Sequence, residues 1–187
     1  MRSDAVVNLN CVVRYKGLSI SRVTKCGTTS ISNALLSVAG DFASLNLCNP
    51  SEAPEGTISF IRDPYARTLS AWADKLKTPD DTIGQKNLIA LGFPVGDFAG
   101  FVRLLPKLHA FNVHTIPQAQ FYRPDFTIYR LGQIGEVWEA LMEQYDWLPK
   151  LSHDRKTGLN VEDFYTDELR KIVRDIYAGD FYIRDKI

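Results

Sequence analysis

The sequence has few cysteines and no long apolar run, and each shortage excludes a class of protein. Its three cysteines, Cys11, Cys26 and Cys48, form no CxxC pair, which argues against a zinc knuckle and a disulfide-stapled secreted domain. No signal peptide is recognisable, and no run of ~18 apolar residues could span a membrane. We therefore expect a cytoplasmic protein with no integral membrane segment.

The sequence also lacks net charge. Lysine plus arginine and aspartate plus glutamate number 22 each, so no overall field attracts nucleic acid or an anionic membrane. We expect no nucleic-acid partner, although a local basic pocket is compatible with this balance. The 187 residues, 45% of them hydrophobic and 24% charged, are typical of one soluble globular domain spanning residues 1–187.

The hydrophobic pattern alternates between strands and helices. Alternating and branched residues predict strands over 18–24, 42–47, 56–63 and 126–132. Helical spacing of apolar residues predicts helices over 29–40, 64–77, 95–108, 137–148 and 166–181. This order indicates an α/β fold with a short, mostly parallel sheet flanked by helices.

The stretch "RVTKCGTTSIS" (22–32) joins a predicted strand to a predicted helix. The first amides of a helix lack internal partners and carry partial positive charge, so they can bind an anion. Gly27 allows close approach of the backbone, Lys25 adds a cation, and hydroxyls follow at 28–30. The order differs from the GxxxxGK[ST] nucleotide loop, because the lysine precedes the glycine. The alternative is a polar helix cap with a solvated lysine.

A second group of polar residues follows the strand at 56–63. Arg62 lies where that strand ends, at the edge of the sheet where open α/β folds bind ligands, and can hold a phosphate. Ser70 lies two turns into the next helix, within reach of the same phosphate. The alternatives are that Arg62 pairs with Asp63 and that Ser70 lies on the helix surface.

Taken together, "KCGTTS" (25–30) and "FIRDPYARTLSAW" (60–72) resemble the sulfotransferase superfamily, and most closely the membrane-type carbohydrate sulfotransferases of sulfotransferase family 2. In that family the first motif binds the 5′-phosphosulfate of 3′-phosphoadenosine 5′-phosphosulfate (PAPS), and the second binds its 3′-phosphate. The resemblance implies PAPS as the co-substrate, with these residues around it: Lys25, Cys26, Gly27, Thr28, Thr29, Ser30, Arg62 and Ser70. It also implies a P-loop-like three-layer sandwich and a hydroxyl-bearing acceptor, by analogy a carbohydrate.

The same resemblance suggests the catalytic groups. Lys25 would stabilise the charge that develops on the oxygen leaving sulfur. Some relatives place a catalytic histidine between the two motifs, whereas this chain has none there. His114 lies in "NVHTIPQAQFY" (112–122), which is similar to a His-x-x-Pro-Gln segment of the family, and is our candidate for the general base. A structural histidine is the alternative, and Glu52 and Glu55 are rival bases.

We expect no metal, because a cation at the leaving oxygen is sufficient for this chemistry, and the sequence shows no carboxylate cluster to hold a metal ion. Arg155 and Lys156 could cover the 3′-phosphate, with a solvated loop as the alternative, and the acceptor loops are expected at 78–96 and 109–125. The rival functions are a small P-loop kinase that uses ATP and Mg²⁺, and a nucleotide-binding protein without catalysis.

Overall fold

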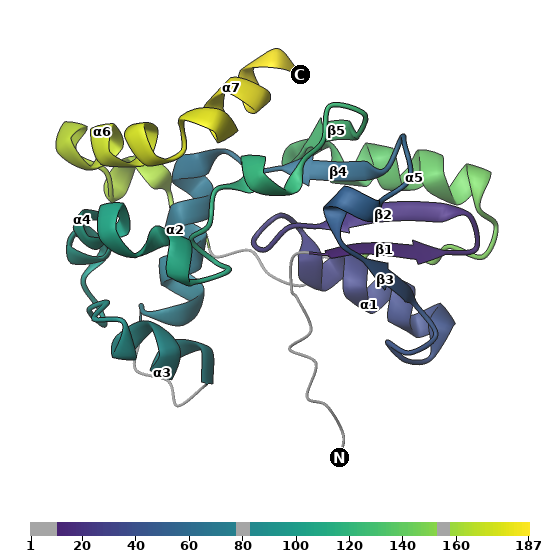
Figure 1. The fold of residues 1–187 in the computed structure, drawn as a ribbon, viewed down its shortest axis with the longest axis horizontal. Coiled ribbons are helices and arrows are strands. Elements are labelled where there is room, and N and C mark those ends of the chain that lie inside the picture. The colour runs from purple at the N-terminus through teal and green to yellow at the C-terminus, as the bar shows by residue number, and fades with distance from the viewer. Residues whose placement is uncertain (1–10, 78–82, 153–157) are drawn as a thin grey trace.

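A five-stranded sheet forms the centre of the computed structural model, which describes residues 11–77, 83–152 and 158–187 (Figure 1). The strand order is β3-β1-β2-β4-β5. The strands are β1 (Cys11–Tyr15), β2 (Leu18–Arg22), β3 (Asn46–Cys48), β4 (Ile58–Ile61) and β5 (Thr127–Arg130). Helices flank this sheet, so the expected mixed α/β fold is confirmed.

The strands β2, β4 and β5 run parallel to one another, as expected, whereas β1 is antiparallel to both β2 and β3. The strand β1 was not predicted from the sequence. Its signal was the pair Lys16 and Gly17, which joins β1 to β2 with positive φ angles of 45° and 88°. Two such residues are typical of a tight hairpin turn.

Seven α-helices occur in the part of the chain that the structure describes. They are α1 (Thr28–Ala39), α2 (Pro64–Lys75), α3 (Ile83–Ala90), α4 (Phe98–Leu108), α5 (Ile134–Gln144), α6 (Asp167–Ile176) and α7 (Ala178–Lys186). Two side chains cap helix starts: Asp63 Oδ1 accepts the Ala66 N–H at 3.0 Å, and Thr166 Oγ1 accepts the Leu169 N–H at 3.3 Å. Among the described residues, no helix is both long and apolar enough to cross a membrane.

The helix predicted over 166–181 is in fact two helices that meet at Tyr177. The break lets the chain turn so that α7 lies against the short 3₁₀ helix Gln118–Phe121. A Cβ on Gly179 would lie 3.1 Å from the Ala119 Cβ, so glycine permits this close approach.

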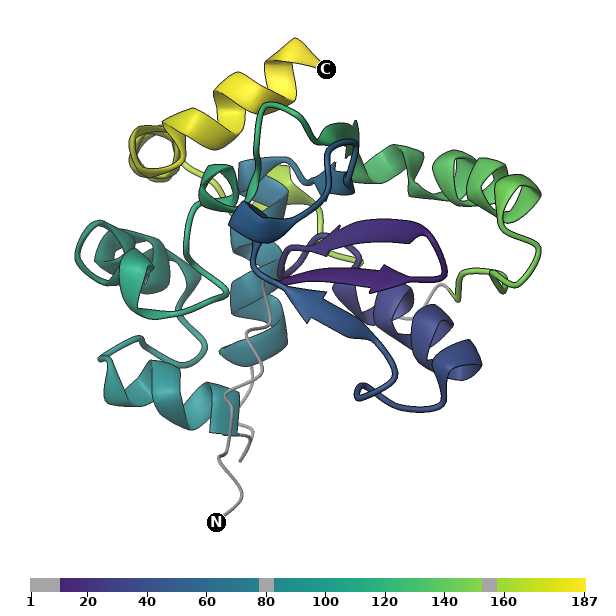
Figure 2. The same ribbon diagram turned by 45° about the vertical axis from the view of Figure 1, so that its right-hand side comes forward.

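Two hydrophobic cores hold the fold together. The first joins α1 and α5 to one face of the sheet, with Ile20, Phe60, Leu35 and Trp138 buried between them. The second joins α2, α4 and α6 beside the sheet, as Figures 1 and 2 show. The opposite sheet face carries a smaller cluster that includes Val12, Ala53 and Phe126.

The parallel pair β2 and β4 decides where a site can form. Each strand is followed by a turn and then a helix, α1 after β2 and α2 after β4. Because the two strands are adjacent and parallel, their carboxyl ends and the starts of both helices lie at the same edge of the sheet.

Candidate functional site

A cavity of about 410 Å³ lies at this edge of the sheet. Three separate segments of the chain contribute the residues that the sequence analysis selected. Its lining includes Lys25, Gly27, Thr28, Thr29, Ser30, Arg62, Ser70 and His114. The fold therefore brings both sequence motifs and the candidate base into one cavity.

The loop between β2 and α1 has the backbone of an anion site. Lys25 and Gly27 both have left-handed φ angles, 68° and 79°, and Gly27 is the N-cap of α1. A Cβ on Gly27 would lie 2.9 Å from Ile134 Cδ1, so a side chain there would clash with the segment after β5. No described side chain caps α1, which leaves its first amides directed at the cavity without a side-chain acceptor.

The side chains of Thr28 and Cys26 are held by hydrogen bonds within the protein. Thr28 Oγ1 donates a hydrogen bond to the Val23 carbonyl at 2.6 Å, so this hydroxyl braces the loop while Thr28 still lines the cavity. The Cys26 side chain is buried, and its Sγ donates to Gln118 Oε1 at 2.8 Å. Burial raises the pKa of Cys26. The Cys26 thiol is therefore placed beneath the loop, as a packed group rather than a reactive one.

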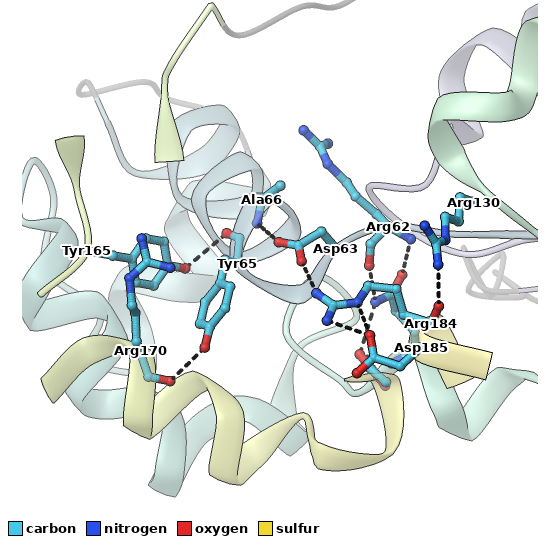
Figure 3. Close-up of polar contacts among 11 residues, drawn as sticks. Arg62, Asp63, Tyr65, Ala66, Arg130, Tyr165, Arg170, Arg184 and Asp185 are labelled. Carbon is cyan, nitrogen blue, oxygen red and sulfur yellow. Dashed lines mark hydrogen bonds and ion pairs between the residues drawn. The ribbon is translucent and has the colours of Figure 1, made fainter. Parts of the chain in front are cut away.

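Arg62 extends from the end of β4 into the cavity, and its Nη1 donates to the Lys25 carbonyl at 3.2 Å. Arg62 does not pair with Asp63. Figure 3 shows Asp63 directed instead toward Arg184 of α7, with which it forms an ion pair, while the Arg62 side chain points the other way. Ser70 is buried in α2 and lines the same cavity.

The Lys25 ammonium lies against α2, with its Nζ 2.8 Å from Asp74 Oδ2. The Lys75 Nζ lies 3.1 Å from the same oxygen. Burial raises the pKa of Asp74, but the two lysines outweigh this effect through hydrogen bonds and charge and lower the value to about 2. Burial lowers the pKa of Lys25, which Asp74 partly offsets. The close geometry and the strongly acidic Asp74 both indicate a charged pair at neutral pH.

His114 is partly buried in the cavity wall. Burial, followed by the positive charges of Lys25 and Lys75, lowers its pKa to about 4, so the imidazole is neutral at pH 7. Its Nδ1 is buried without a hydrogen-bond partner among the described residues. The rival bases lie elsewhere: Glu52 accepts the Asn49 N–H, and Glu55 lines a different cavity near the β1–β2 turn.

Sequence reasoning missed Arg67, which organises the site from behind. This arginine is 2% exposed in α2. Its Nε donates to the Thr24 carbonyl at 3.1 Å, and its Nη1 donates to the Ile116 carbonyl at 2.9 Å. Arg67 thus joins the first motif to the His114 segment. The available signal was its place inside "RDPYARTLS", on the inner face of the predicted helix.

Gln118 and Asp180 were also missed. Gln118 is fully buried; its Oε1 accepts the Arg62 N–H at 3.0 Å, and its Nε2 donates to the Arg62 carbonyl at 2.9 Å. Asp180 of α7 accepts the backbone N–H groups of Gln118 and Ala119 at 2.9 and 2.7 Å. This network fixes the end of β4, where Arg62 begins.

The remaining expectations concern the basic pair Arg155 and Lys156, the acceptor loop 78–96 and a metal site. Arg155 and Lys156 lie outside the described residues, as does part of the expected acceptor loop 78–96. The helix α3 occupies another part of that loop, at Ile83–Ala90. Within the described ranges, no group of three or more His, Cys, Asp or Glu side chains is arranged to hold a metal ion.

Comparison with known proteins gives one finding for this chain. A family model described as "Sulfotransferase family" matches residues 11–183, which includes both motifs and the His114 segment. This match confirms the resemblance to sulfotransferase family 2. Searches of curated proteins and of solved structures gave no match.

Proposed function

Because the chain belongs to the sulfotransferase family, we propose that it transfers the sulfuryl group of PAPS to a hydroxyl group, and that a carbohydrate carries this hydroxyl. The observation that carries the proposal is the single cavity in which the two phosphate-binding motifs and His114 meet. The proposal includes the P-loop-like three-layer sandwich, supported by the strand–loop–helix unit β2–α1 and the parallel strands beside it.

The donor would be held at its two charged ends. The amides that begin α1, the Lys25 ammonium and the hydroxyls of Thr29 and Ser30 suit the 5′-phosphosulfate. Arg62 and Ser70, on the neighbouring β4–α2 unit, suit the 3′-phosphate. The residues fit such a ligand, because the helix start lacks a side-chain cap and the left-handed φ of Gly27 lets the loop turn directly into α1.

The chemistry is an in-line displacement at sulfur. The acceptor oxygen forms a bond to sulfur as the bond from sulfur to the bridging oxygen breaks, and negative charge builds on that leaving oxygen. Lys25 stabilises this charge more in the transition state than in the ground state. His114, neutral at pH 7, accepts the proton of the acceptor hydroxyl.

The pKa of His114 near 4 describes the protein without a donor. Bound phosphosulfate brings negative charge into the cavity, and this charge also compensates the positive charge of Lys25. Both effects favour the protonated form of the His114 imidazole. The basicity of His114 therefore rises when the donor is in place, which is when proton transfer is needed.

Isothermal titration calorimetry tests the donor assignment. We expect 3′-phosphoadenosine 5′-phosphate (PAP) to bind the full chain, and ATP with Mg²⁺ to bind at least tenfold more weakly, since Arg62 and Ser70 recognise a 3′-phosphate. Arg62→Ala should weaken PAP binding by about tenfold to a hundredfold, the loss of one charged hydrogen-bonded contact.

The matched control is Arg103→Ala. This arginine lies on α4 and pairs with Glu168 on the surface, so its loss should leave PAP affinity unchanged. Stronger binding of ATP with Mg²⁺ than of PAP would favour the kinase and contradict the proposal.

A further inference from the structure

Asp74 is an unexpected residue in a cavity that suits an anion. Among the described lining residues it is the single carboxylate, and the same wall carries four cationic side chains: Arg22, Lys25, Arg62 and Lys75. A carboxylate repels a phosphosulfate and weakens its binding. Its presence therefore calls for a role that only a negative charge can fill.

The contacts of Asp74 suggest that role. Its Oδ2 lies 2.8 Å from Lys25 Nζ, although 49 residues separate the two in sequence. Both side chains are mostly buried, with 13% of Lys25 and 20% of Asp74 exposed. Asp74 lies one helical turn after Ser70, so the carboxylate and the expected 3′-phosphate ligand share one face of α2. The free protein thus holds its catalytic lysine on α2.

The Lys25 ammonium cannot pair equally closely with the Asp74 carboxylate and with the donor. An ammonium that approaches the bridging oxygen brings two negatively charged groups toward one cation, and these groups repel each other. Movement of Lys25 toward the donor therefore lengthens its contact with Asp74. The carboxylate then keeps Lys75 but loses the positive charge of Lys25 that helped to compensate its own.

His114 is the group that this charge can act upon. The charged side chains that influence it are Lys25, Lys75, Arg67 and Asp74, and Asp74 alone among them favours the imidazolium. His114 Nδ1 is buried in the same wall, with no hydrogen-bond partner among the described residues. A carboxylate that accepts from Nδ1–H would leave Nε2 as the base, which is the arrangement of an Asp–His pair.

We propose that Asp74 is a positioning residue that exchanges partners: it holds Lys25 in the free protein, and supports His114 once the donor has taken Lys25. This inference rests on the proposed function. This exchange links proton removal from the acceptor to departure of the leaving group. Asp74 supports the base His114 only after Lys25 has moved to the leaving oxygen.

The step balances in atoms and charge. The acceptor O–H loses its proton to His114 Nε2 while its oxygen bonds to sulfur. The bond from sulfur to the bridging oxygen breaks, and its electron pair stays on the 5′-phosphate of PAP beside the Lys25 ammonium. The resulting imidazolium faces Asp74 and later releases its proton to water.

Calorimetry with PAP on a double-mutant cycle tests the first half. We expect Asp74→Asn to tighten PAP binding about tenfold, since it releases Lys25 for the phosphate. In a Lys25→Met background the same change should alter affinity less than about threefold. Asp175→Asn, an exposed carboxylate change on α6, should alter nothing. Circular dichroism checks that each variant folds, and Asp74→Ser replaces Asp74→Asn if that variant does not.

NMR titration of the His114 ring tests the second half. Saturation with PAP should raise the pKa of His114 more in the wild type than in Asp74→Asn, by about one pH unit. If Asp74→Asn tightened PAP binding equally with Lys25 and with Met at position 25, Asp74 would act only through its general electrostatic field. That result would overturn the inference. An equal rise of the His114 pKa with and without the carboxylate would also overturn it. Failure of the wild type to bind PAP would instead defeat the proposed function itself.

Discussion

Lys25 combines two features that rarely occur together, a left-handed backbone and a mostly buried ammonium. The backbone conformation presents the start of α1 to the cavity, and the side chain crosses to α2. Both features serve the same purpose, because the amides and the ammonium can then approach one anion from two sides.

Lys25→Met should lower kcat by about 10² to 10³-fold, because the leaving oxygen loses its cation in the transition state. The affinity for PAP should fall far less, about tenfold or below, since the amides of α1 remain. Steady-state kinetics and calorimetry separate the two effects. Lys107→Met, on α4 outside the cavity, is the control, and an equal loss in both variants would contradict the assignment.

His114 should make stability depend on pH. Its pKa is about 4 in the folded protein and 6.5 in the unfolded chain, so the unfolded state binds more protons between these values. The contribution of His114 to the free energy of unfolding is complete above pH 6.5. It is lost as the pH falls toward 4, by roughly 3 kcal/mol at most.

Urea unfolding at pH 7 and pH 4.5 measures this dependence. His114→Gln should lose much less stability on acidification than the wild type, whereas the matched variant His109→Gln should behave like the wild type. An unchanged pH dependence in His114→Gln would show that His114 is not a buried neutral histidine.

At the scale of elements, the site depends on how α7 closes against the rest of the fold. Asp180 accepts backbone hydrogen bonds from Gln118 and Ala119, and Arg184 pairs with the N-cap Asp63 (Figure 3). Tyr65 adds a third connection through its hydroxyl, which donates to the Arg170 carbonyl of α6 at 3.4 Å. The C-terminal helices thus fix the turn between β4 and α2 that carries Arg62.

Asp180→Ala should lower the free energy of unfolding by about 3 kcal/mol, because it leaves buried backbone N–H donors without an acceptor. Urea denaturation measures this loss. Asp175→Ala, an exposed aspartate on α6, should change stability by less than about 0.5 kcal/mol. Equal effects of the two changes would contradict the structural role of Asp180.

The elements also show where sequence patterns succeed. Local residue spacing is enough to predict some features, because they depend only on residues close in sequence. These features are the caps at Asp63 and Thr166 and the strands β2, β4 and β5. The break at Tyr177 was not predicted, because the contact that it allows, between Gly179 and Ala119, joins residues 60 positions apart in the sequence. The strand β1 had a readable turn signal at Lys16 and Gly17, which the sequence analysis did not use.

At the scale of the whole molecule, each of the two hydrophobic cores supports a different motif of the site. The core of α1, α5 and the sheet supports the first motif, and the core of α2, α4 and α6 supports the second. The motifs themselves were readable, because each is a contiguous stretch with its own physical logic. The contacts of Arg67, Gln118 and Asp180 were not, since each joins distant segments that meet only in the fold. The role of Asp74 required the same three-dimensional information.

A crystal structure of the full chain with PAP would test the donor site most directly. We predict the 5′-phosphate at the N-terminus of α1 within hydrogen-bond distance of Lys25, and the 3′-phosphate on Arg62 and Ser70. PAP bound outside this cavity would contradict the proposal. So would a 3′-phosphate far from Arg62, for example in the separate cavity near the β1–β2 turn that Lys16, Gly17 and Tyr145 line.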